Sequence, residues 1–134
     1  EARMWLDLRS ESRTALAELE QQVRDLITTV QDDGLRFEVE VVGDRPAGAV
    51  AAAHTLVQDS LAVLRLLGVQ GALEAGSTDA NIPLAAGYPA VTIGVTTGGN
   101  AHRLDEFVDT SPVIDGLKQL LTLTLISAER IAGL

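Results

Sequence analysis

The strongest constraint on this chain of 134 residues is a change of hydrophobic period within residues 1–42. Apolar and polar side chains alternate over residues 3–9 and again over residues 35–41, which predicts two half-buried strands. Over residues 11–32 the apolar side chains recur at three- and four-residue steps, which predicts an amphipathic helix for packing on a sheet. We therefore expect a β-α-β unit whose strands are neighbours in one open sheet, with a right-handed crossover or a split arrangement.

Short signals mark the ends of this unit. Ser10 can cap the start of the helix, and Gly34 can end it because glycine adopts the left-handed conformation without strain. Residues 43–48, Gly-Asp-Arg-Pro-Ala-Gly, hold two glycines and a proline. Such a segment predicts a boundary or hinge between two parts of the chain.

The second part of the chain has longer apolar runs. Residues 89–95 are nearly all apolar, as expected of a strand that is covered on both faces. Ser111 and Pro112 predict the start of the last helix, with Ser111 as the cap. The remaining elements that we expect are a helix over residues 49–67, a short strand over 69–75, a short helix around 84–86 and a glycine-rich loop over 96–101. The expected fold class is α/β.

Composition excludes several classes of function. Ten Lys and Arg against 19 Asp and Glu give a net charge of −9, which repels nucleic-acid phosphates and anionic membrane surfaces. We therefore expect no nucleic-acid partner and no membrane partner. Cysteine is absent from the sequence, which excludes disulfides, thiolate metal sites and a cysteine nucleophile and suits a cytoplasmic protein. Because Glu1 leads directly into a strand-like pattern, we expect a piece of a longer protein.

Two histidines are the first candidates for chemistry. His54 lies among alanines within a helical pattern, and a structural or surface histidine is the more frequent reading of such a residue. His102 follows a buried strand and a glycine-rich loop, where open α/β sheets place functional groups, and Glu106 comes four residues later. From position alone, a binding role and a structural role for His102 are equally plausible.

Charged and capping residues supply further candidates, each with two interpretations. Arg45 in the hinge is either a solvated arginine with a weak surface ion pair or a bidentate ligand for a substrate carboxylate. Ser77, Thr78 and Asp79 are either helix caps or the lining of an anion-binding cleft.

Five motifs in this order resemble the dinuclear zinc metallopeptidases of the aminoacylase, glutamate carboxypeptidase and peptidase T superfamily. They are Asp7-Leu8-Arg9, Gly43-Asp44-Arg45-Pro46, Ser77-Thr78-Asp79-Ala80, Pro89-Ala90-Val91-Thr92-Ile93-Gly94 and Ala101-His102-x-x-x-Glu106. The resemblance covers nearly the whole chain. It implies that residues 1–46 are the second half of a ferredoxin-like lid or dimerisation domain, and that residues 47–134 are the C-terminal part of the catalytic domain.

The resemblance also implies roles for single residues. His102 matches the family's last metal ligand, and Glu106 matches a glutamate that would orient this ligand. Arg45 matches the arginine that holds the substrate's free carboxylate, while Thr78 and Asp79 match a turn lining the cleft. The family's other metal ligands and its catalytic glutamate lie in an N-terminal half that is not in this sequence.

Three functions remain open at this stage. The first is the C-terminal part of a zinc hydrolase that acts on a peptide or N-acyl amino acid, inactive alone and binding zinc weakly because His102 is one ligand where three or four are needed. The second is a non-catalytic interaction module that forms a homodimer through the lid. The third is a generic acidic α/β binding domain, which the ordered motifs disfavour.

Overall fold

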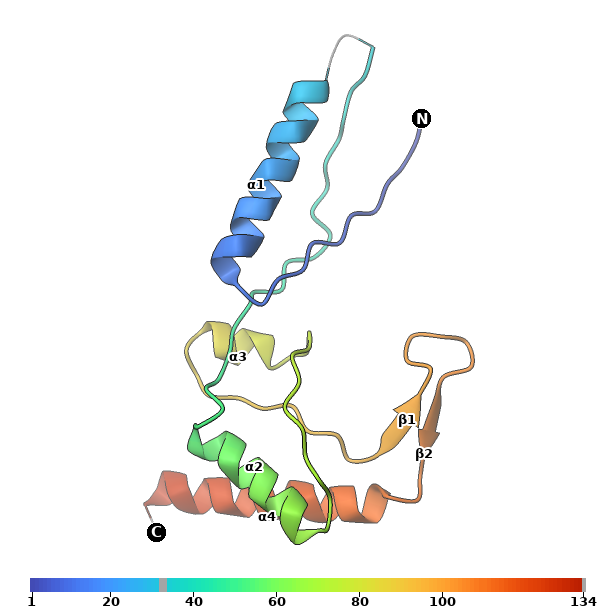
Figure 1. Ribbon diagram of the computed structural model, residues 1–134. Coiled ribbons are helices and arrows are strands. Elements are labelled where there is room, and N and C mark those ends of the chain that lie inside the picture. Colours follow the sequence, from blue (N-terminus) through green and yellow to red (C-terminus); the bar gives the residue numbers. More distant parts are fainter. Residues whose placement is uncertain (32–33, 134) are drawn as a thin grey trace. The chain divides into compact units, whose positions relative to one another are not determined.

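The computed structural model describes residues 1–31 and 34–133 (Figure 1). The chain divides into unit 1, which is Glu1–Ala49 with Asp79–Tyr88, and unit 2, which is Val50–Thr78 with Pro89–Leu134. In the described residues, helices accompany a two-stranded antiparallel sheet, so the fold is of the mixed α/β class.

Unit 1 is built around α1 (Arg13–Val30), which confirms the amphipathic helix expected over residues 11–32. The cap is Ser12 rather than Ser10: the Ser12 hydroxyl accepts the Ala15 N–H at 3.3 Å. Ser10 acts one step earlier, because its hydroxyl accepts the Ser12 N–H at 3.1 Å. The two serines therefore order the chain that leads into α1.

The strands expected on either side of α1 do not form in the described residues. Neither residues 3–9 nor residues 35–41 are helical, but the first segment has no strand and the second has a single bridge at Leu35. For the described residues, the prediction that they are neighbours in one sheet is therefore wrong. Alternation specifies an extended backbone and two faces, whereas a strand also needs a partner at about 4.8 Å. In a split β-α-β arrangement that partner is another strand, and no described residue of unit 1 provides it.

The short helix of unit 1, α3 (Asn81–Ala85), confirms the helix expected around residues 84–86. Two contacts join it to the hinge segment. The Asn81 side-chain amide donates to the Pro46 carbonyl at 3.1 Å, and a Cβ on Gly48 would lie 2.5 Å from the Ala85 nitrogen. Glycine at position 48 therefore allows the hinge backbone to lie directly against α3.

Within residues 1–31 and 34–133, the buried residues all lie in unit 2. Its helices α2 (Thr55–Leu66) and α4 (Val113–Ala132) pack against each other and bury Val57, Val63 and Leu123. The Arg130 guanidinium donates to both carboxylate oxygens of Asp59, at 2.6 and 2.8 Å, and so links the two helices. This bidentate ion pair and three apolar side chains hold the helix pair together.

Helix α2 begins six residues later than the sequence predicts, at Thr55 instead of residue 49. The reason is His54, whose Nδ1 accepts the Leu56 N–H at 3.1 Å and caps the helix. An imidazole nitrogen thus replaces the hydroxyl or carboxylate oxygen that usually caps a helix. This contact gives His54 the structural role that its sequence position suggests.

The structure of unit 2 differs from the sequence predictions in three places. Residues 69–75 and 89–95 form no strand among the described residues. The glycine-rich loop instead contains β1 (Thr97–Gly99), which pairs in antiparallel register with β2 (Phe107–Asp109). Helix α4 has Pro112 at its cap with no side-chain bond, because the Ser111 N–H donates to Asp109 at 2.9 Å and Ser111 is held in the turn before the helix.

Much apolar surface stays exposed in the described residues. The accessible surface of the chain is 10882 Å². A compact protein of 14.1 kDa would expose about 6,700 Å², and two compact units of half this mass about 8,100 Å². Large side chains such as Trp5, at 81% exposure, and Leu125, at 65%, contribute to this excess. None of the described helices combines the length and hydrophobicity needed to cross a membrane.

Candidate functional site

The hairpin between β1 and β2 presents His102. Asn100 and His102 both have left-handed backbone conformations, with φ of 58° and 65°. The Asn100 amide donates to the Asp105 carboxylate at 3.0 Å, and the His102 backbone N–H donates to Glu106 Oε2 at 3.2 Å. Glu106 therefore holds the backbone of the turn, while Asp105 holds the Asn100 side chain.

The left-handed backbone conformation of His102 is less favourable for histidine than for glycine, and it therefore needs an explanation. Glycine enters the left-handed region readily, and asparagine, aspartate and histidine are enriched there among the other residues, for which the conformation costs about 1 kcal/mol. Such positions cluster at functional sites, where the side chain is needed despite the cost. Glu106 contacts the backbone of His102 rather than its imidazole, so in this structure it positions the turn that carries the ring.

Arg45 and Asp79 come together within unit 1. The Arg45 Nη2 and Asp79 Oδ1 atoms lie 3.8 Å apart, with side-chain exposures of 48% and 106%. An ion pair this long and this exposed contributes little to stability. It places a carboxylate of the same unit beside the partly exposed Arg45 guanidinium.

Thr78 belongs to unit 2, where its hydroxyl lies 2.8 Å from the Thr92 hydroxyl. This contact joins the Ser-Thr-Asp motif to the apolar segment 89–95. The candidate residues thus form two groups, Arg45 with Asp79 in unit 1 and Thr78, His102 and Glu106 in unit 2.

The described residues do not form a zinc site by themselves. Within residues 1–31 and 34–133, no group of three or more His, Cys, Asp or Glu side chains lies close enough to hold a metal ion. His102 offers one imidazole, and the nearest partner shown for it, Glu106, binds the backbone of the same turn. Zinc sites in proteins use three or four side-chain ligands.

Two carboxylates near the sequence motifs are held in their charged form. In the Asp7-Leu8-Arg9 motif the Arg9 guanidinium donates to Asp7 at 2.8 Å, which lowers the pKa of the Asp7 carboxyl. At the end of β2, Ser111 donates hydrogen bonds to the Asp109 carboxylate. The bond from its backbone N–H has the largest effect, the bond from its side chain comes second, and together they lower the pKa of the Asp109 carboxyl. Both are short-range contacts between residues two positions apart in the sequence.

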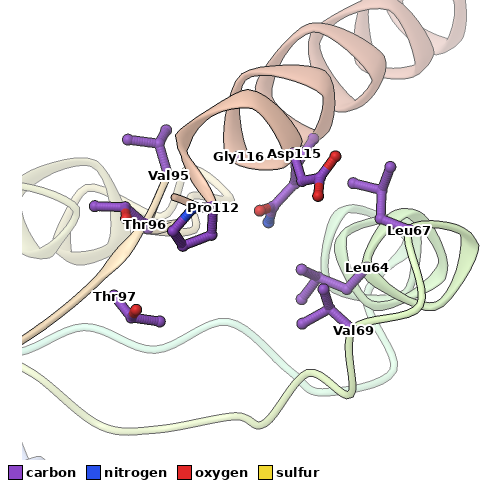
Figure 2. A pocket seen from close by; sticks show the side chains of 11 residues that line it. Leu64, Leu67, Val69, Val95, Thr96, Thr97, Pro112, Asp115 and Gly116 are labelled. Atoms are coloured by element: carbon purple, nitrogen blue, oxygen red, sulfur yellow. The ribbon is translucent and has the colours of Figure 1, made fainter. Parts of the chain in front are cut away.

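Unit 2 also contains a cavity of about 150 Å³ that the sequence motifs do not indicate (Figure 2). Leu64, Leu67 and Val69 line one side, and Val95, Thr96 and Thr97 line the other, with Pro112 and Gly116 of the last helix region between them. Gln119 is the buried polar residue of its wall, at 5% exposure. A single glutamine within a leucine-rich helix carries no sequence signal that distinguishes it from a surface residue.

No protein-family model matches the chain, and no curated protein matches it significantly. The resemblance to zinc metallopeptidases therefore stays a prediction from the five motifs.

Proposed function

We propose that this chain is the C-terminal part of a zinc-dependent hydrolase that cleaves an amide bond near a free carboxylate. The full enzyme would be an exopeptidase, deacylase or other amidohydrolase, and this chain alone would be inactive. The observation that carries the proposal is the turn from His102 to Glu106, in which a histidine is kept in a left-handed conformation by a glutamate four residues later.

The role proposed for His102 follows from this turn. Its imidazole is exposed, while its backbone is fixed by Glu106. A ligand held in this way needs little reorganisation when it meets a metal ion that other residues hold. Because the described residues supply one imidazole, the remaining ligands and the base that activates water would come from outside this sequence, and we assign no catalytic step to this chain.

The role proposed for Arg45 is recognition of the substrate carboxylate. The pair with Asp79 supports this role, since a carboxylate already stands 3.8 Å from the guanidinium. A substrate carboxylate that makes two short hydrogen bonds would replace this longer contact. Asp79 would then line the approach to Arg45 within unit 1, as the resemblance implies.

The test begins with the gene that encodes this chain. The proposal expects histidine, aspartate and paired glutamate codons upstream of Glu1. The product of the complete reading frame, assayed with zinc, should hydrolyse N-acyl amino acids or dipeptides, and His102→Ala should abolish the activity. An upstream region without these residues, or activity that survives His102→Ala, would reject the proposal.

A non-catalytic dimerisation module is the second candidate, and the surface of unit 1 favours it. Apolar side chains of the two extended segments are strongly exposed, among them Met4, Trp5, Leu6, Phe37 and Val41. Sedimentation of the chain and of Trp5→Ser would distinguish the two: a module of this kind forms a dimer that Trp5→Ser dissociates, and its complete gene product lacks hydrolase activity.

A further inference from the structure

Three contacts within unit 1 join the hinge segment, residues 43–48, to α3 and to the turn before it. They follow the same order along both segments: Arg45 with Asp79, Pro46 with Asn81, and Gly48 with Ala85. Because the contacts succeed one another in this order, the hinge backbone lies along α3 in one register.

The middle contact anchors the hinge most firmly. The Asn81 side-chain amide donates to the Pro46 carbonyl at 3.1 Å, and both residues are half-buried. The ion pair between Arg45 and Asp79 is longer and more exposed. A hydrogen bond that is partly shielded from water costs more to lose than an exposed ion pair of this length.

The backbone carries this anchor to Arg45. A proline ring fixes its own φ at about −65° and restricts the residue before it to extended conformations. With its carbonyl held, Pro46 therefore leaves the backbone of Arg45 little freedom. The exposed Arg45 directly precedes Pro46, Ala47 and Gly48, which are half-buried.

The position of Asn81 in α3 indicates that its side chain serves this contact. Asparagine is favoured at the cap of a helix and alanine within it. In α3 the order is reversed, because Ala80 is the cap and Asn81 is the first helical residue. The contact with Pro46, made across 35 positions of the sequence, accounts for an order that the helix alone does not favour.

We propose that Asn81 is a positioning residue for Arg45. By holding the Pro46 carbonyl, Asn81 fixes the direction in which the Arg45 guanidinium extends, so that its fork is preorganised for the substrate carboxylate. A preorganised group loses less freedom on binding, which strengthens binding without any further contact to the substrate. The inference rests on the proposed function for the substrate, and on the contacts of the hinge for the positioning.

The first experiment uses this chain alone and needs no hydrolase activity. NMR relaxation should give backbone order parameters of about 0.85 at Arg45, Ala47 and Gly48. In Asn81→Leu, which keeps the size and removes the amide, the same values should fall below about 0.6. Gln22→Leu on the exposed surface of α1 also replaces an amide by leucine and should leave the hinge unchanged. A flexible hinge in the unaltered chain would overturn the proposal without any variant, as would an unchanged hinge in Asn81→Leu.

The second experiment measures steady-state kinetics with the product of the complete reading frame. Asn81→Leu should raise KM for substrates with a free carboxylate about five- to tenfold with little change in kcat, because one hydrogen bond that supports binding is lost. KM for amidated substrates should change by less than about twofold, and Gln22→Leu should match the unaltered enzyme on both.

A double variant separates positioning from a general effect on the fold. If Asn81 acts through Arg45, Asn81→Leu adds no further loss once Arg45→Ala has removed the guanidinium. Losses that multiply, or an equal loss on free and amidated substrates, would overturn the proposal. A complete product without hydrolase activity would reject the proposed function, whereas a hinge that loses its order in Asn81→Leu would still support the positioning of Arg45.

Discussion

At the scale of single residues, the proposed binding role of His102 predicts that its side chain contributes little to folding. A left-handed φ of 65° costs a histidine about 1 kcal/mol that glycine would not pay. We expect His102→Gly to change the free energy of unfolding by less than about 0.5 kcal/mol, since relief of strain offsets the greater entropy of the unfolded chain. Urea denaturation measures this, and a loss above about 1 kcal/mol would show that the imidazole is structural.

The role proposed for Arg45 can be tested in the product of the complete reading frame, assayed on substrates with a free or an amidated carboxylate. Loss of a charge-assisted contact to a carboxylate should cost about 2 to 4 kcal/mol, or roughly 30- to 1,000-fold in kcat/KM. Arg45→Ala should therefore lose activity on substrates with a free carboxylate, be much less impaired on the amidated substrates, and bind metal normally. Steady-state kinetics on both substrates decide this, and an equal loss on both would make Arg45 structural.

The sequence indicated some of the residues that the structure singles out, but not all of them. Arg45 and His102 could be singled out from the sequence because each is a charged or imidazole side chain in or directly after a glycine-containing loop. Both lie outside helices and strands in the structure. The cap formed by His54 and the buried amide of Gln119 could not be predicted, because each depends on a neighbour that folding brings close.

At the scale of elements, the contact between α4 and the apolar segment 89–95 depends on Gly116. In an exposed helix, alanine would be about 1 kcal/mol more favourable than glycine. Here a Cβ would overlap the Val95 carbonyl group, so we expect Gly116→Ala to destabilise unit 2 by about 1 to 3 kcal/mol. Thermal denaturation compares it with Gly43→Ala, where a Cβ meets no atom within 4 Å and the change should stay within about 0.5 kcal/mol. A stabilised Gly116→Ala would contradict the close approach.

The ion pair between α2 and α4 predicts how the helix pair responds to acid. The hydrogen bonds from Arg130 lower the pKa of the Asp59 carboxyl, so the folded state favours its charged form. This stabilisation is fully present above the unfolded-state pKa, about 3.9, and is lost as pH falls through the lower folded-state value. The difference in Tm between the unaltered chain and Asp59→Asn should therefore be constant above about pH 5 and shrink below about pH 4. A difference that does not depend on pH would mean that the pair does not stabilise the fold.

Helices were predictable from periodicity, and strands were not. The stripe along α1 and the leucines of α4 predict their helices because helical hydrogen bonds are local. The alternation of residues 3–9 and 35–41 and the apolar run of 89–95 indicate extended chain, but their hydrogen bonds need partners that the described residues do not supply. The β1–β2 hairpin formed instead, where a short loop brings both strands together.

At the scale of the whole molecule, the most conspicuous property of the described residues is their large exposed apolar surface. The described residues bury three large apolar side chains, Val57, Val63 and Leu123, and leave most of the others accessible. We expect Leu123→Ala to destabilise unit 2 by about 2 to 4 kcal/mol, because this small core has little else to replace the lost contacts. Denaturant titration measures it, and a change below about 1 kcal/mol would show that the α2–α4 pair is not the stabilising core.

The central claim is that His102 is one ligand of a zinc site that residues outside this sequence complete, and zinc titration by calorimetry tests it most directly. The account predicts no submicromolar binding to this chain, and tight binding to the product of the complete reading frame that His102→Ala weakens. Submicromolar, stoichiometric binding to this chain alone that is lost in His102→Ala would contradict it, as would tight binding to the complete product that His102→Ala leaves unchanged.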